Sequence, residues 1–323
     1  MNIDLSTEAT DFGSAALSAL AAAGGDRLLE SAEEKPADRA SGIEPILAQL
    51  GAFDLDPRGG ADELEAAASL CRSAGFWALP YPVAERLSRP ADLDTDALIV
   101  VSEHHPSAAV AGLDLRMAAV TVAGRRFRAT AMPSDEPPHT SAFVTRLELE
   151  PVDETTDADL ALALVLPMWT LLGMLDRAME LTRSHILLRE QFGRPLAQLQ
   201  GVQFQLTDAE VERAGLEVLA KYALWSIDTG LDEMVDDALA LRLAALEAAD
   251  TVFRVAHQLH GATGFCDETT LSWLSRHSVP LRRLPLGLSA TSDALTRRVG
   301  RRGLTGLYRG SSESADVREV VAP

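Results

Sequence analysis

Two stretches of this 323-residue chain decide its fold: Arg189–Gln200, which reads REQFGRPLAQLQ, and Gln258–Phe265, which reads QLHGATGF. Each follows a long run in which apolar residues recur every three or four positions, the spacing of a buried helix face. Arg189 is the last cation of the first run and is followed by a Gly-x-Pro turn, while Gly261 ends the second run. The pattern therefore predicts a bundle of long helices with a sharp turn at each stretch.

Working outward, the hydrophobic pattern divides the chain into four parts. Residues 1–92 have helical spacing, with a helix start at Ser6, and residues 93–152 contain short β-branched or alternating runs. Residues 153–310 return to helical spacing, and residues 311–323 predict a flexible tail. We therefore expect a mostly α-helical protein, with an N-terminal helical domain, a small β domain and a C-terminal helical bundle.

Individual elements can be placed within this plan. Strands are expected at 97–101, 117–123, 125–131 and 142–149, forming an antiparallel unit with its longest loop at 132–140. Bundle helices are expected from Asp157, at 196–226 and at 231–260, with shorter helices at 268–276 and 290–299. The charged segment 33–39 predicts an exposed connection. The apolar stretch 160–175 contains Pro167, is too short to span a bilayer and predicts a buried helix.

Composition excludes several classes of function. A net charge of -19 disfavours nucleic-acid and anionic-membrane partners, since both need clustered basic residues. Two cysteines, Cys71 and Cys266, make neither a disulfide framework nor a zinc site and fit a reducing cytoplasm. The first residues show no basic region followed by an apolar run, so we expect no signal peptide and a cytoplasmic protein.

The first stretch carries side chains suited to a phosphate-bearing cofactor. A guanidinium fixed at Arg189 can bind a phosphate oxygen bidentately. Phe192 can cover an aromatic ring, and Gln200, about one turn into the next helix, can hydrogen-bond a cofactor edge. The plainer interpretation is that Arg189 and Gln191 are solvated and Phe192 is a core aromatic.

The second stretch admits two interpretations as well. Gly261 and Gly264 allow backbone N–H groups to approach a diphosphate closely, or they form an ordinary glycine end to the helix. His257 and His260 lie three residues apart, but no carboxylate sits nearby at metal-ligand spacing. We therefore expect core or capping histidines and no metal site.

Together the two stretches resemble the flavin-binding signatures of acyl-CoA dehydrogenases, R-x-x-F-G-x-x-L-x-x-F-Q and Q-x-x-G-G-x-G-[FY]. Segments 47–53 and 75–85 are also similar to the N-terminal helical domain of that family. In the family, both signatures contact the ADP half of an FAD held mainly by a neighbouring subunit. Leu199 replaces the usual Phe, and Ala262 replaces a preferred Gly. The resemblance implies FAD contacts at Arg189, Gln191, Phe192, Leu196, Gln200, Gln258, Gly261 and Ala262.

The chemistry of the family is α,β-dehydrogenation of an acyl-CoA thioester, in which a carboxylate removes the α-proton while hydride passes to the flavin. Well-placed general-base catalysis contributes roughly two to four orders of magnitude. Here the two family base positions carry Pro285 and Ala163, and no acid lies between Glu268 and Asp293 or between Asp159 and Asp176. The β region is about half the expected size, and its Asp135–Pro138 segment only faintly echoes the flavin-cradling segment of the family.

This pattern is that of the short non-catalytic subunit of heterotetrameric acyl-CoA dehydrogenases, which are known from actinobacterial steroid catabolism. The resemblance implies FAD shared with a homologous full-length subunit, an acyl-CoA substrate, and an electron-transfer flavoprotein as acceptor. By itself this chain would then be inactive. Two alternatives stay open: a self-sufficient homo-oligomeric dehydrogenase with an unorthodox base such as Asp159 or Glu268, and a flavin-free scaffold.

Overall fold

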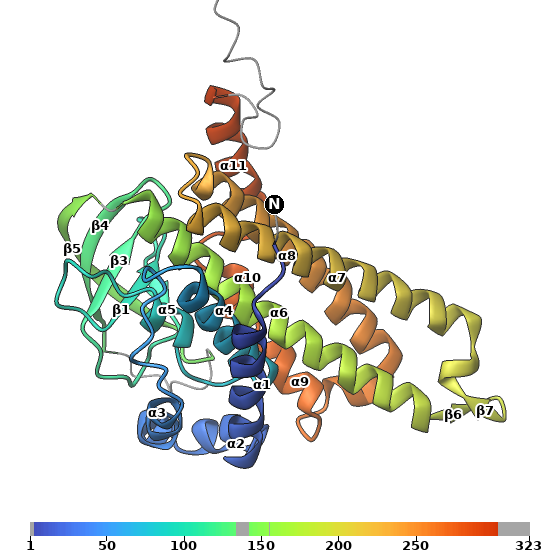
Figure 1. Ribbon diagram of the computed structural model, residues 1–323. Helices are drawn as coiled ribbons and strands as arrows, with labels where there is room; N and C mark the ends of the chain where they lie inside the picture. The colour runs from blue at the N-terminus through green and yellow to red at the C-terminus, as the bar shows by residue number, and fades with distance from the viewer. Residues whose placement is uncertain (1–2, 134–141, 155, 303–323) are drawn as a thin grey trace, which may run out of the picture.

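The computed structural model describes residues 3–133, 142–154 and 156–302, and Figure 1 shows a small sheet at one side of long helices that extend away from it. The tail expected at 311–323, the Asp135–Pro138 segment and most of the loop expected at 132–140 lie outside the described residues. The N-terminal helices are α1 (Thr7–Ala22), α2 (Arg27–Glu34), α3 (Arg39–Gln49), α4 (Ala61–Phe76) and α5 (Val83–Leu87), with a short 3-10 turn at Pro36–Asp38.

The start of α1 and the segment 33–39 were both predicted from the sequence. Ser6 caps α1 as expected, because its hydroxyl accepts a hydrogen bond from the Ala9 amide at 3.2 Å. The expected exposed connection at 33–39 is confirmed except at its last residue: positions 34, 35, 37 and 38 are exposed, and Arg39 is buried. Arg39 is only 2% exposed, donates to the Ala111 carbonyl at 2.9 Å and lies over the Phe143 ring. Its partners are about 70 to 100 positions away, so no local pattern could reveal its burial.

Within the described residues the sheet has five strands, in the order β1-β3-β4-β5-β2. Their bounds are β1 Ala97–Val100, β2 Ser107–Ala108, β3 Met117–Val120, β4 Arg125–Ala131 and β5 Thr145–Glu154. The expected purely antiparallel unit is wrong, since β1 pairs in parallel with β3. The segment between them returns the chain to the same end of the sheet, which a parallel pair requires. β2 is only two residues long and was not expected.

One face of strands β1 and β3 packs against the helices, and the other face carries a separate apolar cluster. Leu98, Val100, Ala118 and Val120 belong to the main core with the helices, whereas Ile99, Met117 and Phe127 belong to a second cluster on the other face. This alternation is the period-two pattern of a strand covered on both faces.

The C-terminal bundle contains α6 (Asp157–Leu188), α7 (Gln200–Asp228) and α8 (Met234–His260), followed by α9 (Thr270–His277), α10 (Val279–Arg283) and α11 (Leu288–Arg302). The expected helix at 196–226 begins later, because Leu196–Gln198 form a 3-10 turn and Leu199 is extended. Gln200 is therefore the first residue of α7 and not one turn into it.

The α6 helix forms the centre of the fold. It is 32 residues long and apolar enough to cross a membrane by length and composition, so the expectation that this segment is too short is wrong. However, 83% of its most apolar window is buried inside the protein, as expected of a core helix. It packs against α4, α7 and α8.

Contact between α4 and α6 depends on two glycines. A methyl group at Gly75 would lie 1.9 Å from the Thr170 carbonyl oxygen, and one at Gly173 would lie 1.9 Å from the Arg72 carbonyl oxygen. Since both obstacles are backbone atoms of the opposite helix, they cannot move aside as a side chain does. The two helices therefore touch backbone to backbone at this crossing.

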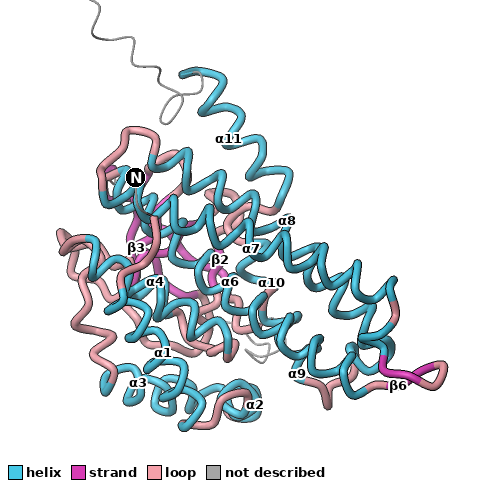
Figure 2. Tube along the Cα trace, turned by 45° about the vertical axis from the view of Figure 1, so that its right-hand side comes forward, coloured by secondary structure: helices cyan, strands magenta, loops and turns pink. Residues whose placement is uncertain are grey.

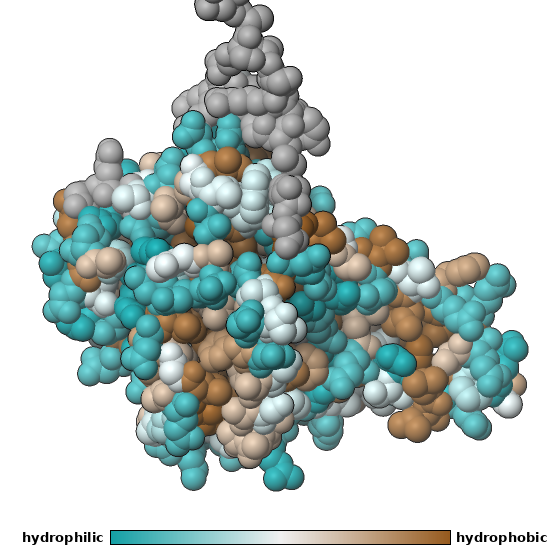
Figure 3. Space-filling model, in the orientation of Figure 1, coloured by the Kyte–Doolittle hydropathy of each residue, from teal (hydrophilic) through white to brown (hydrophobic). Residues whose placement is uncertain are grey.

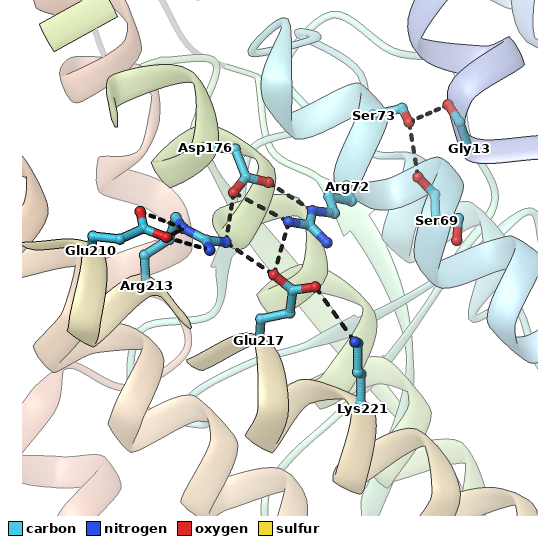
Figure 4. A network of polar contacts seen from close by, with 9 residues as sticks. All are labelled: Gly13, Ser69, Arg72, Ser73, Asp176, Glu210, Arg213, Glu217 and Lys221. Atoms are coloured by element: carbon cyan, nitrogen blue, oxygen red, sulfur yellow. Dashed lines mark hydrogen bonds and ion pairs between the residues drawn. The ribbon is translucent and has the colours of Figure 1, made fainter. Parts of the chain in front are cut away.

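A charged network next to this crossing joins α4, α6 and α7 (Figure 4). Arg72 of α4 donates to Asp176 of α6 at 2.6 Å and to Glu217 of α7 at 3.2 Å. Arg213 donates to the same two carboxylates at 3.1 and 3.0 Å. Although burial opposes ionisation, hydrogen bonds from Arg72 and Arg213 lower the pKa of Glu217 to about 2. The network thus holds the helices in register through charge-assisted hydrogen bonds.

Candidate functional site

The first motif folds as a hairpin at one end of the bundle, where Figures 1 and 2 show it projecting beyond the helices. β6 (Glu190–Gln191) pairs with β7 (Arg194–Pro195), and Phe192 and Gly193 form the turn with φ of +54° and +75°. Positive φ at both turn residues is typical of a two-residue hairpin, and for a residue such as Phe192 it is strained. Leu196, 8% exposed, packs into the main core and anchors the hairpin.

The second motif forms a tight turn after α8. Gly261 ends the helix with φ of +62°, as the sequence predicts, and Gly261–Phe265 continue as a 3-10 turn. A methyl group at Gly264 would lie 3.0 Å from the His260 Cβ, so glycine permits close packing there. The Thr263 hydroxyl donates to the His260 carbonyl at 2.7 Å. These contacts hold the turn against the end of α8.

Stacked rings bring the two motifs together. His185, in the last turn of α6, stacks on His260 with ring centroids 4.4 Å apart, and His257 stacks on Phe265 at the same distance. A ring nitrogen of His260 also bonds to the Ala256 carbonyl at 2.8 Å. Burial lowers the pKa of all three histidines. The histidines therefore pack as neutral rings, in agreement with the expected core or capping role.

Nearly all the predicted contact residues are exposed at this end of the bundle. Leu196 is buried, and the exposed ones are Arg189, Gln191, Phe192, Gln200, Gln258, Gly261 and Ala262. Within the described part of the chain, the side chains of Arg189, Gln191, Gln200 and Gln258 make no hydrogen bond or ion pair. Their donors and acceptors are thus available to a group that approaches from outside. Phe192, 88% exposed, is not a core aromatic.

These residues fit the ADP half of FAD. The free guanidinium of Arg189 matches a phosphate oxygen, and the exposed ring of Phe192 offers a flat apolar face. Arg194 on the hairpin and Arg254, one turn before Gln258, are also exposed. They add positive charge locally to a chain whose net charge is -19. Glu190 on the same hairpin is exposed as well, so the two motifs offer an anionic ligand three exposed arginines beside this one carboxylate.

The two positions at which the resemblance predicts the family base line the same cavity. Ala163 of α6 and Pro285, which follows α10, line one cavity of about 130 Å³ between the N-terminal helices, the sheet and the bundle. Neither position supplies an acid. Asp159, one proposed substitute, is ion-paired with Arg58. Glu268, the other, is exposed, and neither Asp159 nor Glu268 is among the described residues that line the cavity.

Sequence reasoning missed three charged residues of this cavity: Arg39, Glu85 and Arg242. Arg242 donates to the carbonyls of Leu284 and Leu286, both at 2.7 Å, and so holds the segment that contains Pro285. Burial lowers the pKa of Arg39 and of Arg242 to about 10, so both stay charged at neutral pH. One signal was present: Arg242 is the single charge in the apolar run 238–246.

The described residues form no metal site, and the two cysteines form no disulfide. Over residues 3–133, 142–154 and 156–302, no three His, Cys, Asp or Glu side chains are placed to hold a metal ion. Cys71 is buried and Cys266 exposed, and both are free thiols. Burial, with the nearby Glu85, raises the pKa of Cys71, which keeps its thiol protonated.

Comparison with known proteins agrees with this geometry. Residues 164–289 match the family Acyl-CoA dehydrogenase, C-terminal domain. Acryloyl-CoA reductase (NADH) of Anaerotignum propionicum is 30% identical over 105 residues, which are 32% of this chain and 26% of that protein. The chain thus matches about a quarter of the length of this curated relative.

Solved structures extend the likeness to nearly the whole chain. The ChsE4–ChsE5 complex from Mycobacterium tuberculosis contains a chain with a TM-score of 0.72 and 17% identity, covering 95% of this chain and 100% of that one. A Tcur3481–Tcur3483 steroid ACAD variant gives 0.69 and 20%, covering 91% and 98%. This chain therefore carries an acyl-CoA dehydrogenase C-terminal domain within the acyl-CoA dehydrogenase fold.

Proposed function

We propose that this chain is the non-catalytic subunit of a heteromeric, FAD-dependent acyl-CoA dehydrogenase, and that its bundle end completes the FAD site of a homologous catalytic subunit. One contrast carries the proposal. The predicted contacts to the ADP half lie at the hairpin end and are exposed except for Leu196, and the polar side chains among them have no hydrogen-bond or ion-pair partner in the described part of the chain. The two family base positions, Ala163 and Pro285, line an interior cavity and supply no acid.

In this proposal each predicted contact residue binds a particular part of FAD. Arg189 binds a phosphate oxygen, and Phe192 covers the adenine side. Gln200 and Gln258 hydrogen-bond the cofactor edge, and the turn at Gly261 and Ala262 lets backbone N–H groups approach the diphosphate. Bound FAD supplies the two-electron acceptance of the reaction. This chain binds and orients, while the acid that takes the substrate proton belongs to the partner.

Exposed apolar side chains near the motifs support a protein partner at this end. Leu188 is 83% exposed, Phe265 69% and Phe204 60%, and Figure 3 shows apolar surface gathered toward the hairpin end of the bundle. Large apolar side chains grouped on a surface are typical of interaction sites. The ChsE4–ChsE5 structure is a complex, and the Tcur3481–Tcur3483 structure is of a steroid ACAD named for two components, which supports a heteromer with an acyl-CoA substrate of steroid type. An electron-transfer flavoprotein is the proposed acceptor.

Visible flavin absorbance tests the proposal. The chain is purified alone and after co-expression with a homologous full-length subunit that carries a base, and each preparation is assayed for acyl-CoA dehydrogenation. We expect flavin and activity only in the co-expressed complex. Flavin and activity in the chain alone would instead establish the self-sufficient enzyme, and absence of flavin from both preparations would establish the flavin-free scaffold.

A further inference from the structure

Helix α7 carries apolar side chains on two opposite faces. On one face, Ala209 and Leu216 are buried in the main core. On the opposite face, Phe204, Val211 and Val218 are 60%, 63% and 57% exposed. Because these three lie seven residues apart, they line up along one side of the helix, and we call them the α7 stripe. A helix that is apolar on both faces is normally covered on both.

Gly215 adjoins the α7 stripe. It lies four residues after Val211, one turn along the same side of the helix, and is exposed. A methyl group at this position would meet nothing within 4 Å, so the packing of this chain does not require glycine here. Glycine inside a helix is destabilising relative to alanine, but it lets a second backbone approach closely. Gly215 therefore leaves room for another helix against the stripe.

Acidic side chains border the stripe. Asp208 and Glu212 are exposed, and within the described part of the chain their carboxylates make no hydrogen bond or ion pair. Glu210, on the other border, is bound by Arg213 at 2.7 Å, and the amine of Lys221 is ion-paired as well. A surface that fits the stripe therefore presents Lys or Arg to Asp208 and Glu212. A second copy of α7 would bring further acids to the contact, which opposes self-association.

The stripe starts next to a predicted FAD contact. Gln200 is the first residue of α7, and Phe204 follows it one turn later. Gln200 lies eleven residues before Val211, which is about three helical turns, so its side chain leaves α7 on the same side as the stripe. A subunit that holds FAD against Gln200 then already lies over this face of α7. The exposed stripe continues that contact along the helix.

We propose that the α7 stripe binds a helix of the catalytic partner subunit, which crosses α7 close to Gly215 with apolar side chains in its centre and Lys or Arg at its border. This role rests on the proposed function, because the partner is the subunit that holds FAD. Burial of the stripe supplies the apolar contact, and the cations pair with Asp208 and Glu212. The contact joins the two subunits through side chains of their own, whether or not flavin is bound.

Val211→Gln and Val218→Gln are the test variants. Glutamine is a good helix former and both positions are exposed, so each variant should unfold like the wild type when it is alone. Sedimentation velocity over a dilution series measures the dissociation constant of the complex with the co-expressed full-length subunit. We expect each variant to raise it at least about tenfold, since an amide replaces a buried apolar contact. Val152→Gln, at a valine of β5 that is 39% exposed, is the matched control and should leave it unchanged.

The glycine and the acids of this face are tested separately. Gly215→Ala should raise the unfolding temperature of the chain alone, yet raise the dissociation constant at least about fivefold, because the methyl group keeps the partner helix at a distance. A role confined to the helix of this chain would not weaken binding. Asp208→Lys combined with Glu212→Lys should weaken binding at low salt, and its difference from the wild type should shrink by about 0.5 M NaCl, where charges are screened.

Circular dichroism checks that each variant is folded. The stripe does not bind the partner if folded Val211→Gln and Val218→Gln form the complex as tightly as the wild type. It binds a second copy instead if the chain alone dimerises and these changes abolish the dimer. In either case, flavin in the wild-type complex leaves the proposed function intact. A complex without flavin that these changes still weaken refutes the FAD assignment and keeps the role of the stripe, whereas no complex at all refutes both.

Discussion

His185 in the last turn of α6 stacks on His260, the last residue of α8, with ring centroids 4.4 Å apart. This stack joins the helix that leads into the hairpin to the helix that leads into the glycine turn. The two motifs thereby share one end of the bundle although Arg189 and Gln258 are far apart in the sequence.

Lowering the pH should destabilise the stacked pair of His185 and His260. Burial, His260 and Arg189 lower the pKa of His185 below its ordinary value of 6.5, and burial lowers that of His260. The folded state then binds fewer protons than the unfolded chain, so its stability is complete above about pH 6.5 and falls as the pH drops through that value toward the folded pKa. Urea unfolding from about pH 7.5 to about pH 5.5 should show this loss. The slope should be smaller in His185→Gln, and equal slopes for both proteins would contradict the prediction.

Arg189→Ala should weaken flavin retention in the complex. Loss of a charge-assisted hydrogen bond of this kind costs about 1.5–3 kcal/mol, or roughly ten- to a hundredfold in affinity. Flavin content after gel filtration measures the effect. Arg128→Ala, which removes an exposed arginine from β4 instead, is the matched control and should retain flavin. Unchanged flavin content in Arg189→Ala would count against the assignment of this motif.

Glu217 should make the bundle acid-sensitive in a different pH range. Its pKa is about 2 in the folded state, where hydrogen bonds from Arg72 and Arg213 overcome the effect of burial, and its ordinary value is 4.5. Its contribution to stability is therefore present above about pH 4.5 and is lost between there and about pH 2. We expect Glu217→Gln to lower the free energy of unfolding at pH 7 by about 1–3 kcal/mol and to approach wild type near pH 2.5. A difference that is the same at both pH values would exclude this account.

The close contact between α4 and α6 predicts that a larger side chain at Gly173 destabilises the protein, independently of pH. Gly173→Ala places a methyl group 1.9 Å from a backbone oxygen, so the helices must separate. Overpacking of this kind costs about 1–3 kcal/mol and sometimes more, and we expect at least the upper value here. Gly215→Ala on α7 is the control, since nothing lies within 4 Å of its new methyl group. It should stabilise the helix by about 0.5–1 kcal/mol. Thermal unfolding compares the two, and equal midpoints would contradict the packing argument.

Short-range features of this fold were readable in advance. The Ser6 cap, the long helices before each motif and the end of α8 at Gly261 depend on residues three or four positions apart, and the structure confirms them. The resemblance carried by 189–200 and 258–265 indicated the mostly helical fold of the acyl-CoA dehydrogenases, which the comparisons confirm. The assignment of Arg189 and its companions to FAD stays a prediction.

Long-range features were decided only by the tertiary structure. The parallel pairing of β1 with β3 and the burial of Arg39 against Phe143 both depend on how distant segments meet. The cavity around Glu85 is the clearest case, because its wall comes from the N-terminal helices, the sheet and the bundle. Sequence alone settled which segments are helical, since that preference is local. Which side chains face one another was settled by packing, since that depends on the whole chain.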